Sequence, residues 1–202
     1  MPFSNPAADH PAKRALILDF DGVVVETEAL HFACWNRTFE EFDGRRVSGD
    51  HRQLVGLTLE QIFAHWSQAG DSPLDLTHAQ KERLLARKTE LYFALGRTSL
   101  APMSGLLPLM RRAQTGDWYV AIASRARRRR LMGTLELLNL PPIFDLVMGS
   151  EDVVDPVSDR KRHGRAAAPF GILPSHCVVV EDSASGVADA CADGIGHVIG
   201  LT

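Results

Sequence analysis

The sequence predicts an α/β fold: a Rossmann-like core with a parallel sheet, and a helical cap domain inserted after the first strand. Short, uninterrupted apolar runs are typical of strands buried on both faces, and they occur at residues 15–18, 119–123, 177–180 and, more weakly, 197–199. Helical patterns separate these runs at residues 104–115, 127–139 and 183–193. This alternation of strands and helices indicates a parallel sheet with helices on both faces.

The segment between the first two predicted strands breaks the alternation, because it contains helical patterns only. Two possible capping boxes mark helix starts within it, at Thr58 with Gln61 and at Thr77 with Gln80. We expect a helical cap at residues 27–98 and a discontinuous core at residues 12–26 and 99–202. Residues 1–11 are polar and contain several prolines, and are expected to form a flexible tail.

The composition is that of an ordinary globular protein. Of the 202 residues, 45% are hydrophobic and 23% are charged, and the net charge of −3 offers no positive field for nucleic acid. No apolar run approaches the roughly 20 residues of a membrane helix, and the N-terminus lacks the apolar core of a signal peptide. We therefore expect a cytoplasmic protein, monomeric or weakly dimeric, with no nucleic-acid or membrane partner. Three widely spaced cysteines (Cys34, Cys177 and Cys191) favour reduced thiols in a core over disulfides or a zinc site.

Oxygen-bearing side chains stand at the ends of three predicted strands. Asp19 and Asp21 follow the first strand, Ser124 follows the second, and Glu181 and Asp182 follow the run at residues 177–180. Parallel strands end at one edge of the sheet, and ligands bind at that edge in such folds. These side chains are therefore expected to lie close together.

The strongest single signal is the pair Asp19 and Asp21, followed directly by Gly22. Two carboxylates at this spacing repel each other unless a cation lies near them. Magnesium relieves such repulsion and favours carboxylates together with substrate phosphate, and Gly22 permits a sharp turn. The alternative for the pair alone is a solvated strand end before a turn, and the acidic residues Glu181 and Asp182 at another strand end argue against it.

The segment from Asp19 to Trp35 begins Asp-Phe-Asp-Gly and contains His31. It resembles the first motif of the haloacid dehalogenase superfamily, and over its full length the β-phosphoglucomutase branch, which includes sugar-phosphate phosphatases. The resemblance implies that Asp19 attacks phosphorus and becomes an aspartyl phosphate. It also implies that Asp21 is the general acid and base toward the sugar oxygen. Such a group must carry a proton near neutral pH, so we expect the pKa of Asp21 to be shifted upward.

The resemblance also implies a metal site. Glu181 and Asp182 match the acidic metal-binding motif, and Gly186 stands where that motif has its glycine. The expected ligands of Mg²⁺ are these two residues together with Asp19 and Asp21, the last through its backbone carbonyl.

Further residues are candidates for contact with the substrate. The resemblance implies that Ser124 supplies a phosphate-binding hydroxyl, although a helix N-cap explains a serine there equally well. Gly22 and Arg125 are further candidates of this kind. Residues Arg127–Arg130 wrap around a predicted helix, so we expect a mainly solvated face there.

Two residues of the predicted cap are also candidates for substrate contact. Lys88 shares a helical stripe with Leu84, Leu91 and Leu95, where a lysine is unusual unless its amine reaches solvent or an anion. The resemblance implies substrate contact for Lys88 and for His31. The alternatives are a lysine at the cap rim that reaches solvent, and a packed or surface histidine.

The third motif departs from the family pattern. In relatives a lysine, usually followed by proline, steadies the aspartate and the phosphate, but residues 155–165 contain no Lys-Pro pair. Counting back from Gly171 places the lysine slot near Val157, and Lys161 comes later. Lys161 or Arg162 can serve only through a shortened loop, and we expect instead a site that operates without this cation.

These observations predict a Mg²⁺-dependent phosphatase that acts on a small phosphorylated sugar or a similar phosphomonoester through an aspartyl phosphate. Two alternatives stay open. A sugar phosphomutase of this branch uses a cap arginine after a glycine, whereas the segment Gly56-Leu57-Thr58-Leu59 has leucine in that slot, which favours hydrolysis. The other alternative is a catalytically impaired binding protein, because the third-motif lysine is missing.

Overall fold

The computed structural model describes residues 14–54, 57–153 and 159–201. The predicted tail at residues 1–11 and the predicted lysine slot at Val157 lie outside the described residues. Within the described part, five parallel strands form one sheet in the order β3-β2-β1-β4-β5. Their bounds are β1 Arg14–Leu18, β2 Trp118–Ala123, β3 Leu146–Met148, β4 Cys177–Glu181 and β5 His197–Gly200.

The strand order places β1 between β2 and β4. Leu16 of β1 lies opposite Val120 of β2 and opposite Val178 of β4. The three strands therefore end side by side at the carboxyl edge. Just past the end of β1, the backbone N–H of Asp19 donates to the carbonyl of Val180 at 3.0 Å, which ties the first acidic residue to β4.

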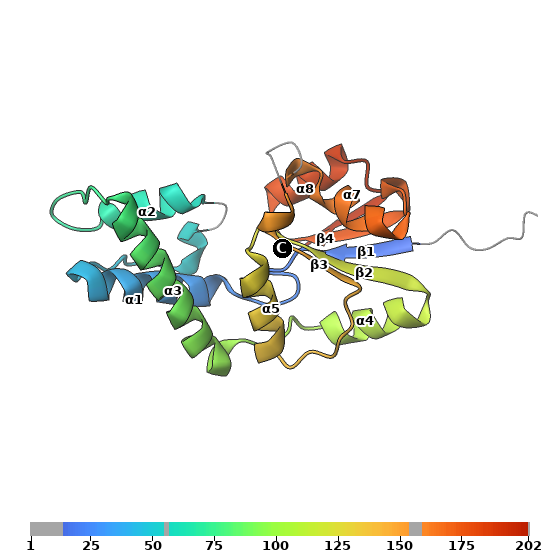
Figure 1. Cartoon of the computed structure of the whole chain (residues 1–202), viewed down its shortest axis with the longest axis horizontal. Coiled ribbons are helices and arrows are strands. Elements are labelled where there is room, and N and C mark those ends of the chain that lie inside the picture. Colours follow the sequence, from blue (N-terminus) through green and yellow to red (C-terminus); the bar gives the residue numbers. More distant parts are fainter. Residues whose placement is uncertain (1–13, 55–56, 154–158, 202) are drawn as a thin grey trace, which may run out of the picture.

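Helices cover both faces of the sheet, as the predicted alternation requires (Figure 1). On one face, Leu16 and Leu18 pack with α4 Leu106–Thr115 and α5 Arg128–Leu137. On the other face, Ala15 and Ile17 pack with α7 Arg162–Ala167 and α8 Ala184–Ala192. Short 3₁₀ turns complete the core: η2 Ser150–Asp152, η3 Ala168–Phe170 and η4 Pro174–His176.

The helical insertion lies between β1 and β2 and extends beyond the carboxyl edge of the sheet (Figure 1). Its elements are α1 Glu28–Asp43, η1 His51–Leu54, α2 Leu59–Ser67 and α3 His78–Ser99. Both predicted capping boxes are confirmed, at the starts of α2 and α3. The insertion has an apolar core of its own around Trp35, Phe39 and Trp66. It contacts the sheet domain through α3 and α5, where the hydroxyls of Tyr92 and Thr134 lie 3.1 Å apart.

Three details differ from the sequence expectations. Strand β3 was not predicted, because it has three residues of which only Met148 is buried, too short a signal to separate from a loop. Cys191 is exposed, whereas Cys34 and Cys177 are buried as expected. Leu95 is 41% exposed, because the buried stripe of α3 continues from Leu91 and Tyr92 to Gly96 and leaves Leu95 outside.

Within the described ranges, none of the helices is both long enough and apolar enough to span a membrane.

Candidate active site

Three carboxylates meet at the carboxyl edge of the sheet. Asp19 follows β1, Glu181 ends β4 and Asp182 comes next, and one oxygen of each lies within 4.8 Å of the others. We call Asp19, Glu181 and Asp182 the acidic cluster. The adjacency of β1 and β4 brings them together from positions that are far apart in the chain.

Two glycines make room for this cluster. Gly22 has φ of 72°, a left-handed conformation that favours glycine. A Cβ on Gly22 would lie 2.0 Å from Oδ2 of Asp182, and a Cβ on Gly186 would lie 2.1 Å from the carboxylate of Glu181. The N–H of Gly22 donates to the carbonyl of Val25 at 2.8 Å, so the turn itself uses this N–H. Gly22 thus shapes the site by leaving space for Asp182.

The acidic cluster has the electrostatics of a cation site. Burial raises the pKa of Asp19 well above its ordinary value, and the negative charges of Glu181 and Asp21 raise it further. Burial, followed by the charges of Glu181 and Glu28, raises the pKa of Asp182 to about 6. Carboxylates that disfavour one another's ionisation are stabilised by a divalent cation with oxygen ligands, as Mg²⁺ prefers. The donor set therefore fits Mg²⁺.

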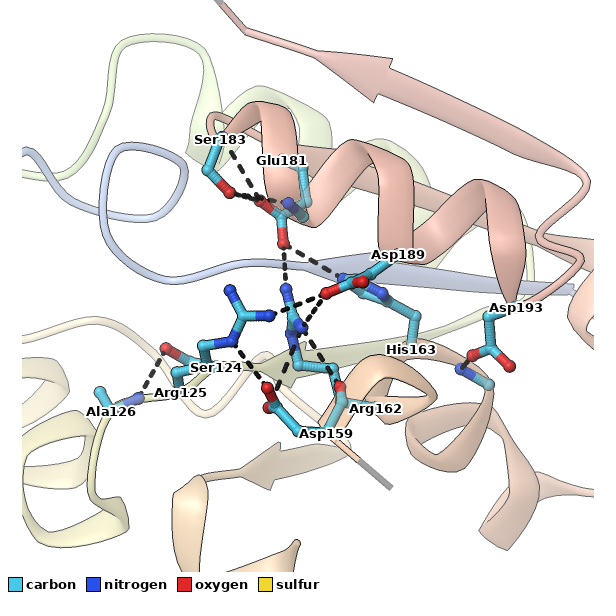
Figure 2. Close-up of polar contacts among 12 residues, drawn as sticks. Ser124, Arg125, Ala126, Asp159, Arg162, His163, Glu181, Ser183, Asp189 and Asp193 are labelled. Atoms are coloured by element: carbon cyan, nitrogen blue, oxygen red, sulfur yellow. Dashed lines mark hydrogen bonds and ion pairs between the residues drawn. The ribbon is translucent and has the colours of Figure 1, made fainter. Parts of the chain in front are cut away.

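Glu181 differs from its two neighbours because its carboxylate contacts the side chains of Arg162 and His163 (Figure 2). One of its oxygens accepts from Nη2 of Arg162 at 2.8 Å and from Nε2 of His163 at 3.2 Å. The other accepts from the hydroxyl of Ser183 at 3.0 Å. Burial alone would raise the pKa of Glu181, but the contacts with His163 and Arg162 outweigh it and lower the pKa to about 2. Glu181 is therefore ionised at neutral pH.

The buried cation of this region is Arg162, the residue after Lys161. Lys161 occupies the N-cap position of α7 and its side chain is exposed. It forms no ion pair with a carboxylate in the described part of the chain. Arg162 is 2% exposed and pairs with Glu181 and also with Asp189, at 3.3 Å. Arg162 thus brings a guanidinium to Glu181 of the acidic cluster, whereas Lys161 beside it is exposed.

Ser124 directly follows β2 at the same edge and is buried. Its hydroxyl accepts from the N–H of Ala126 at 3.2 Å, and the N-cap of α5 is Arg127, so Ser124 is not the helix cap considered above. Arg125 donates to Asp159 at 2.9 Å and to Asp189 at 2.8 Å (Figure 2). Arg125 therefore belongs to the same ion-pair network as Arg162.

Asp21 has surroundings opposite to those of Asp19. Its two oxygens accept from the two terminal nitrogens of Arg130, at 2.8 Å and 2.5 Å, and one also accepts from the hydroxyl of Thr27. Burial would raise the pKa of Asp21, but the charge and hydrogen bonds of Arg130 outweigh it, and the pKa lies well below its ordinary value. The expected upward shift is therefore wrong for this conformation, because an arginine from α5 reaches the carboxylate.

His31 and Lys88, the two candidates from the cap, contact each other beside the ion pair of Asp21 and Arg130. Nζ of Lys88 lies 2.6 Å from Nδ1 of His31, and Nη1 of Arg130 lies 3.3 Å from Nε2 of the same ring. Burial, then the charge of Lys88, lowers the pKa of His31 to about 4, so the ring is neutral at pH 7. A charged lysine and an arginine both only donate, so a neutral ring accepts from Lys88 or from Arg130 but not from both. We call Arg130, Lys88 and His31 the basic cluster.

The structure brings together Asp19, Glu181 and Asp182, and separately Asp21, His31 and Lys88. Arg130 was missed, because the run Arg127–Arg130 was interpreted as mainly solvated. That interpretation holds for the first three arginines, which are exposed. A signal was present: Arg130 precedes Leu131 and lies one turn before Thr134, the two buried positions of α5. His163 was also missed, and no sequence pattern pointed to it.

Comparison with known proteins agrees with this geometry. Residues 16–199 match the family described as haloacid dehalogenase-like hydrolase. The protein CbbY of Rhodobacter capsulatus is 28% identical over 193 residues, which cover 92% of this chain and 84% of that protein. The phosphorylated carbohydrates phosphatase of Thermotoga maritima is 25% identical over 187 residues, which cover 93% of this chain and 84% of that protein.

Solved structures show the same fold. CbbY from Rhodobacter sphaeroides in complex with phosphate has a TM-score of 0.77 at 24% identity, over 93% of this chain and 85% of that one. Its complex with xylulose bisphosphate has a TM-score of 0.76 at 22% identity, with the same coverage. The family match spans most of the chain, and the sheet with its helical insertion is the one these relatives have. The chain therefore belongs to the haloacid dehalogenase superfamily, in subfamily IA, and is related to β-phosphoglucomutase, CbbY and the sugar-phosphate phosphatases.

Proposed function

We propose that this hydrolase is a Mg²⁺-dependent phosphatase that acts on a small phosphorylated sugar or a similar phosphomonoester, through an aspartyl phosphate at Asp19. The observation that carries the proposal is the acidic cluster itself. It joins the candidate nucleophile Asp19 to the carboxylates of Glu181 and Asp182. The buried Ser124 follows β2 at the same edge of the sheet. The names of two relatives, a phosphorylated carbohydrates phosphatase and CbbY, support the choice of substrate class.

The proposed chemistry uses the two aspartates in turn. An oxygen of the ionised Asp19 forms a bond to phosphorus while the bond from phosphorus to the sugar oxygen breaks. Asp21, which must first leave Arg130 and take up a proton from water, gives that proton to the sugar oxygen. Water then attacks the phosphorus of the aspartyl phosphate, Asp21 takes a proton from the water, and inorganic phosphate leaves. The hydroxyl of Ser124 is assigned to a phosphate oxygen.

The acidic cluster would hold Mg²⁺, together with the backbone carbonyl of Asp21. When bound, Mg²⁺ offsets the negative charge on the transferring phosphoryl group. Arg162 contributes differently: it holds Glu181 ionised and in place, and it puts a fixed positive charge under the cluster. This arrangement favours an active enzyme over the impaired binding protein, because Arg162 supplies a cation in the region where the lysine motif is absent.

The test is turnover of p-nitrophenyl phosphate and of a panel of phosphorylated sugars, with Mg²⁺ and with excess chelator. We expect Mg²⁺-dependent release of inorganic phosphate and a covalent phosphoenzyme that hydroxylamine cleaves, as an acyl phosphate requires. Full activity in chelator contradicts the metal assignment. If no member of the panel is hydrolysed, the alternative of a binding protein replaces the phosphatase. A mutase would instead return sugar phosphate, without net release of phosphate.

A further inference from the structure

The two oxygens of Glu181 face different parts of the protein (Figure 2). Oε1 accepts from Nη2 of Arg162 at 2.8 Å and from Nε2 of His163 at 3.2 Å, and both donors belong to α7. Among the described residues, Oε2 accepts from Ser183 alone, from its hydroxyl at 3.0 Å and from its N–H at 3.4 Å. A carboxylate oxygen has two lone-pair sites, so the donors from α7 fill Oε1. The N–H contact of Oε2 is longer than the roughly 2.7–3.2 Å of ordinary hydrogen bonds, which leaves Oε2 with room for a cation.

The start of α7 brings both donors to Oε1. Arg162 and His163 are the first two residues of this helix, and both side chains are buried. Ala166 and Ala167 follow about one turn later and are fully buried in the core on that face of the sheet. Because these side chains are small, the helix packs closely on the sheet, and its first two side chains reach the end of β4.

His163 makes its one hydrogen bond within the described ranges to Glu181. The ring is 0% exposed, and Nδ1 is buried there without a hydrogen-bond partner. Because an ionised carboxylate only accepts, Nε2 of His163 carries a proton and donates it. Arg162, in contrast, also donates to Asp159 and Asp189. Burial of a polar ring in place of an apolar one is costly, so the contact with Glu181 is what distinguishes His163 from a phenylalanine at this position.

We propose that His163 is a positioning residue that raises the selectivity of the acidic cluster for Mg²⁺ over Ca²⁺. Together with Arg162 it holds Oε1 of Glu181, so that Glu181 offers a cation a single oxygen. Mg²⁺ requires a near-ideal octahedron, whereas Ca²⁺ takes roughly six to eight oxygens and often both oxygens of one carboxylate. A carboxylate limited to one oxygen therefore suits Mg²⁺ and withholds a ligand from Ca²⁺. The inference rests on the metal site proposed above and concerns which ion that site selects.

Calorimetric titration of the metal-free protein with Mg²⁺ and with Ca²⁺ tests the inference without turnover. His163→Phe keeps a ring in the core but removes the donor, which frees a lone-pair site on Oε1. It should weaken Mg²⁺ binding about 10-fold or more, the usual cost of losing an indirect partner of a metal ligand. Ca²⁺ binding should be unchanged or tighter, because Glu181 can offer a second oxygen. The ratio of the Mg²⁺ affinity to the Ca²⁺ affinity should therefore fall about 10- to 100-fold.

Two further variants separate positioning from packing. His163→Gln keeps an N–H donor and should retain most of the wild-type affinity ratio. His176→Phe makes the same change as His163→Phe at an exposed histidine and should bind both ions as the wild type does. An unchanged ratio in His163→Phe overturns the inference. A His163→Gln variant that is as unselective as His163→Phe also overturns it, because packing alone then explains the loss.

A measurement on the wild type decides the matter if His163→Phe does not fold. Nuclear magnetic resonance of isotope-labelled histidine should show a slowly exchanging proton on Nε2 of the buried His163 ring, both in metal-free protein and with Mg²⁺ bound. The inference is overturned if the proton of this ring is on Nδ1, or if the Nε2 proton loses its protection when Mg²⁺ binds.

Asp182→Ala shows whether the titrations report on the acidic cluster, since removal of this proposed ligand should weaken the binding of both ions. If the wild type binds Mg²⁺ but His163→Phe leaves the affinity ratio unchanged, this inference fails and the proposed function stands. If the wild type binds neither ion, or if Asp182→Ala binds both as tightly as the wild type, the proposed metal site fails together with this inference.

Discussion

Asp19 and Asp21 stand two residues apart in the chain, yet they occupy opposite electrostatic environments. Asp19 belongs to the acidic cluster, where neighbouring carboxylates raise its pKa. Asp21 faces the basic cluster, where Arg130 lowers its pKa. The difference arises from the neighbours that each one meets: β4 of the core beside Asp19, and α5 with the cap helices beside Asp21. One short motif can thus hold two carboxylates with opposite pKa shifts, because separate elements surround them.

The largest expected effect on turnover comes from removing the Asp19 carboxylate of the acidic cluster. Asp19→Asn should lower turnover by at least about 10³-fold, because an amide cannot form the acyl phosphate. In metal-free protein the variant should unfold at the same or a higher temperature, since a repelled charge is removed. Phosphate release and thermal unfolding are the measurements, with Asp71→Asn, at an exposed position, as control. More than a trace of activity would show that Asp19 is not the nucleophile.

The second-largest effect is expected from removing Arg162, the cation that contacts Glu181 of the acidic cluster. Arg162→Met should lower kcat about 10²- to 10³-fold, the usual cost of a positioned donor, whereas Lys161→Met should change it little. Loss of Arg162 also leaves Glu181 buried without its partner, at a cost of about 3–5 kcal/mol. Unfolding by urea must therefore accompany the kinetics, and Arg162→Lys tests whether charge alone is sufficient. A larger loss from Lys161→Met than from Arg162→Met would reverse the assignment.

The affinity for Mg²⁺ should distinguish a proposed ligand, Asp182, from Ser183, which acts only through Glu181. Ser183→Ala touches the metal site only through Glu181, and such indirect partners cost about 10- to 100-fold in metal affinity. Asp182→Ala removes a ligand and should cost more. Titration of the rate with Mg²⁺ gives both values, and excess chelator should abolish activity in every variant. Equal Mg²⁺ affinities for the two variants would remove Asp182 from the ligand set.

In the basic cluster, the ionisation of Lys88 should make kcat/KM depend on pH. Its pKa of about 8 belongs to the substrate-free protein, so kcat/KM should fall as the pH rises above this value and the ammonium loses its charge. The effect on kcat should be smaller, because a bound anion keeps the lysine protonated. Lys88→Arg should remove the decline, since arginine stays charged. An unchanged decline in that variant would place its cause elsewhere.

The smallest expected effect concerns the stability of metal-free protein. The pKa of Asp182 is raised from 3.8 to about 6 in the folded state, so the folded protein holds a proton that the unfolded chain has released. This stabilising contribution is complete below the unfolded pKa and is lost as the pH rises through 6. The free energy of unfolding should therefore decrease over this range more in the wild type than in Asp182→Asn. Mg²⁺ should remove the difference; an identical slope in both proteins would contradict the assignment.

The sequence alone determined the class of fold and the edge of the sheet at which the candidate site lies. Continuous apolar runs ending at Asp19, Ser124 and Glu181 required buried parallel strands, and parallel strands place their ends together. The two capping boxes were also readable, because a Thr and a Gln three residues apart meet within one helical turn. The apolar runs and the capping boxes both depend on residues that are close together in the chain. They can therefore be recognised in a single sequence.

Only the tertiary structure decided which cation serves which carboxylate. Arg130 and Asp21 are 109 positions apart, and Arg162 and Glu181 are 19 apart. Each pair forms because separate elements converge: α5 on the turn after β1, and α7 on β4. Whether an arginine meets solvent or a carboxylate depends on the rotation of its helix and the length of the preceding loop. Adjacent residues such as Arg129 and Arg130, or Lys161 and Arg162, have similar charge in the sequence, and only packing places one outside and the other inside.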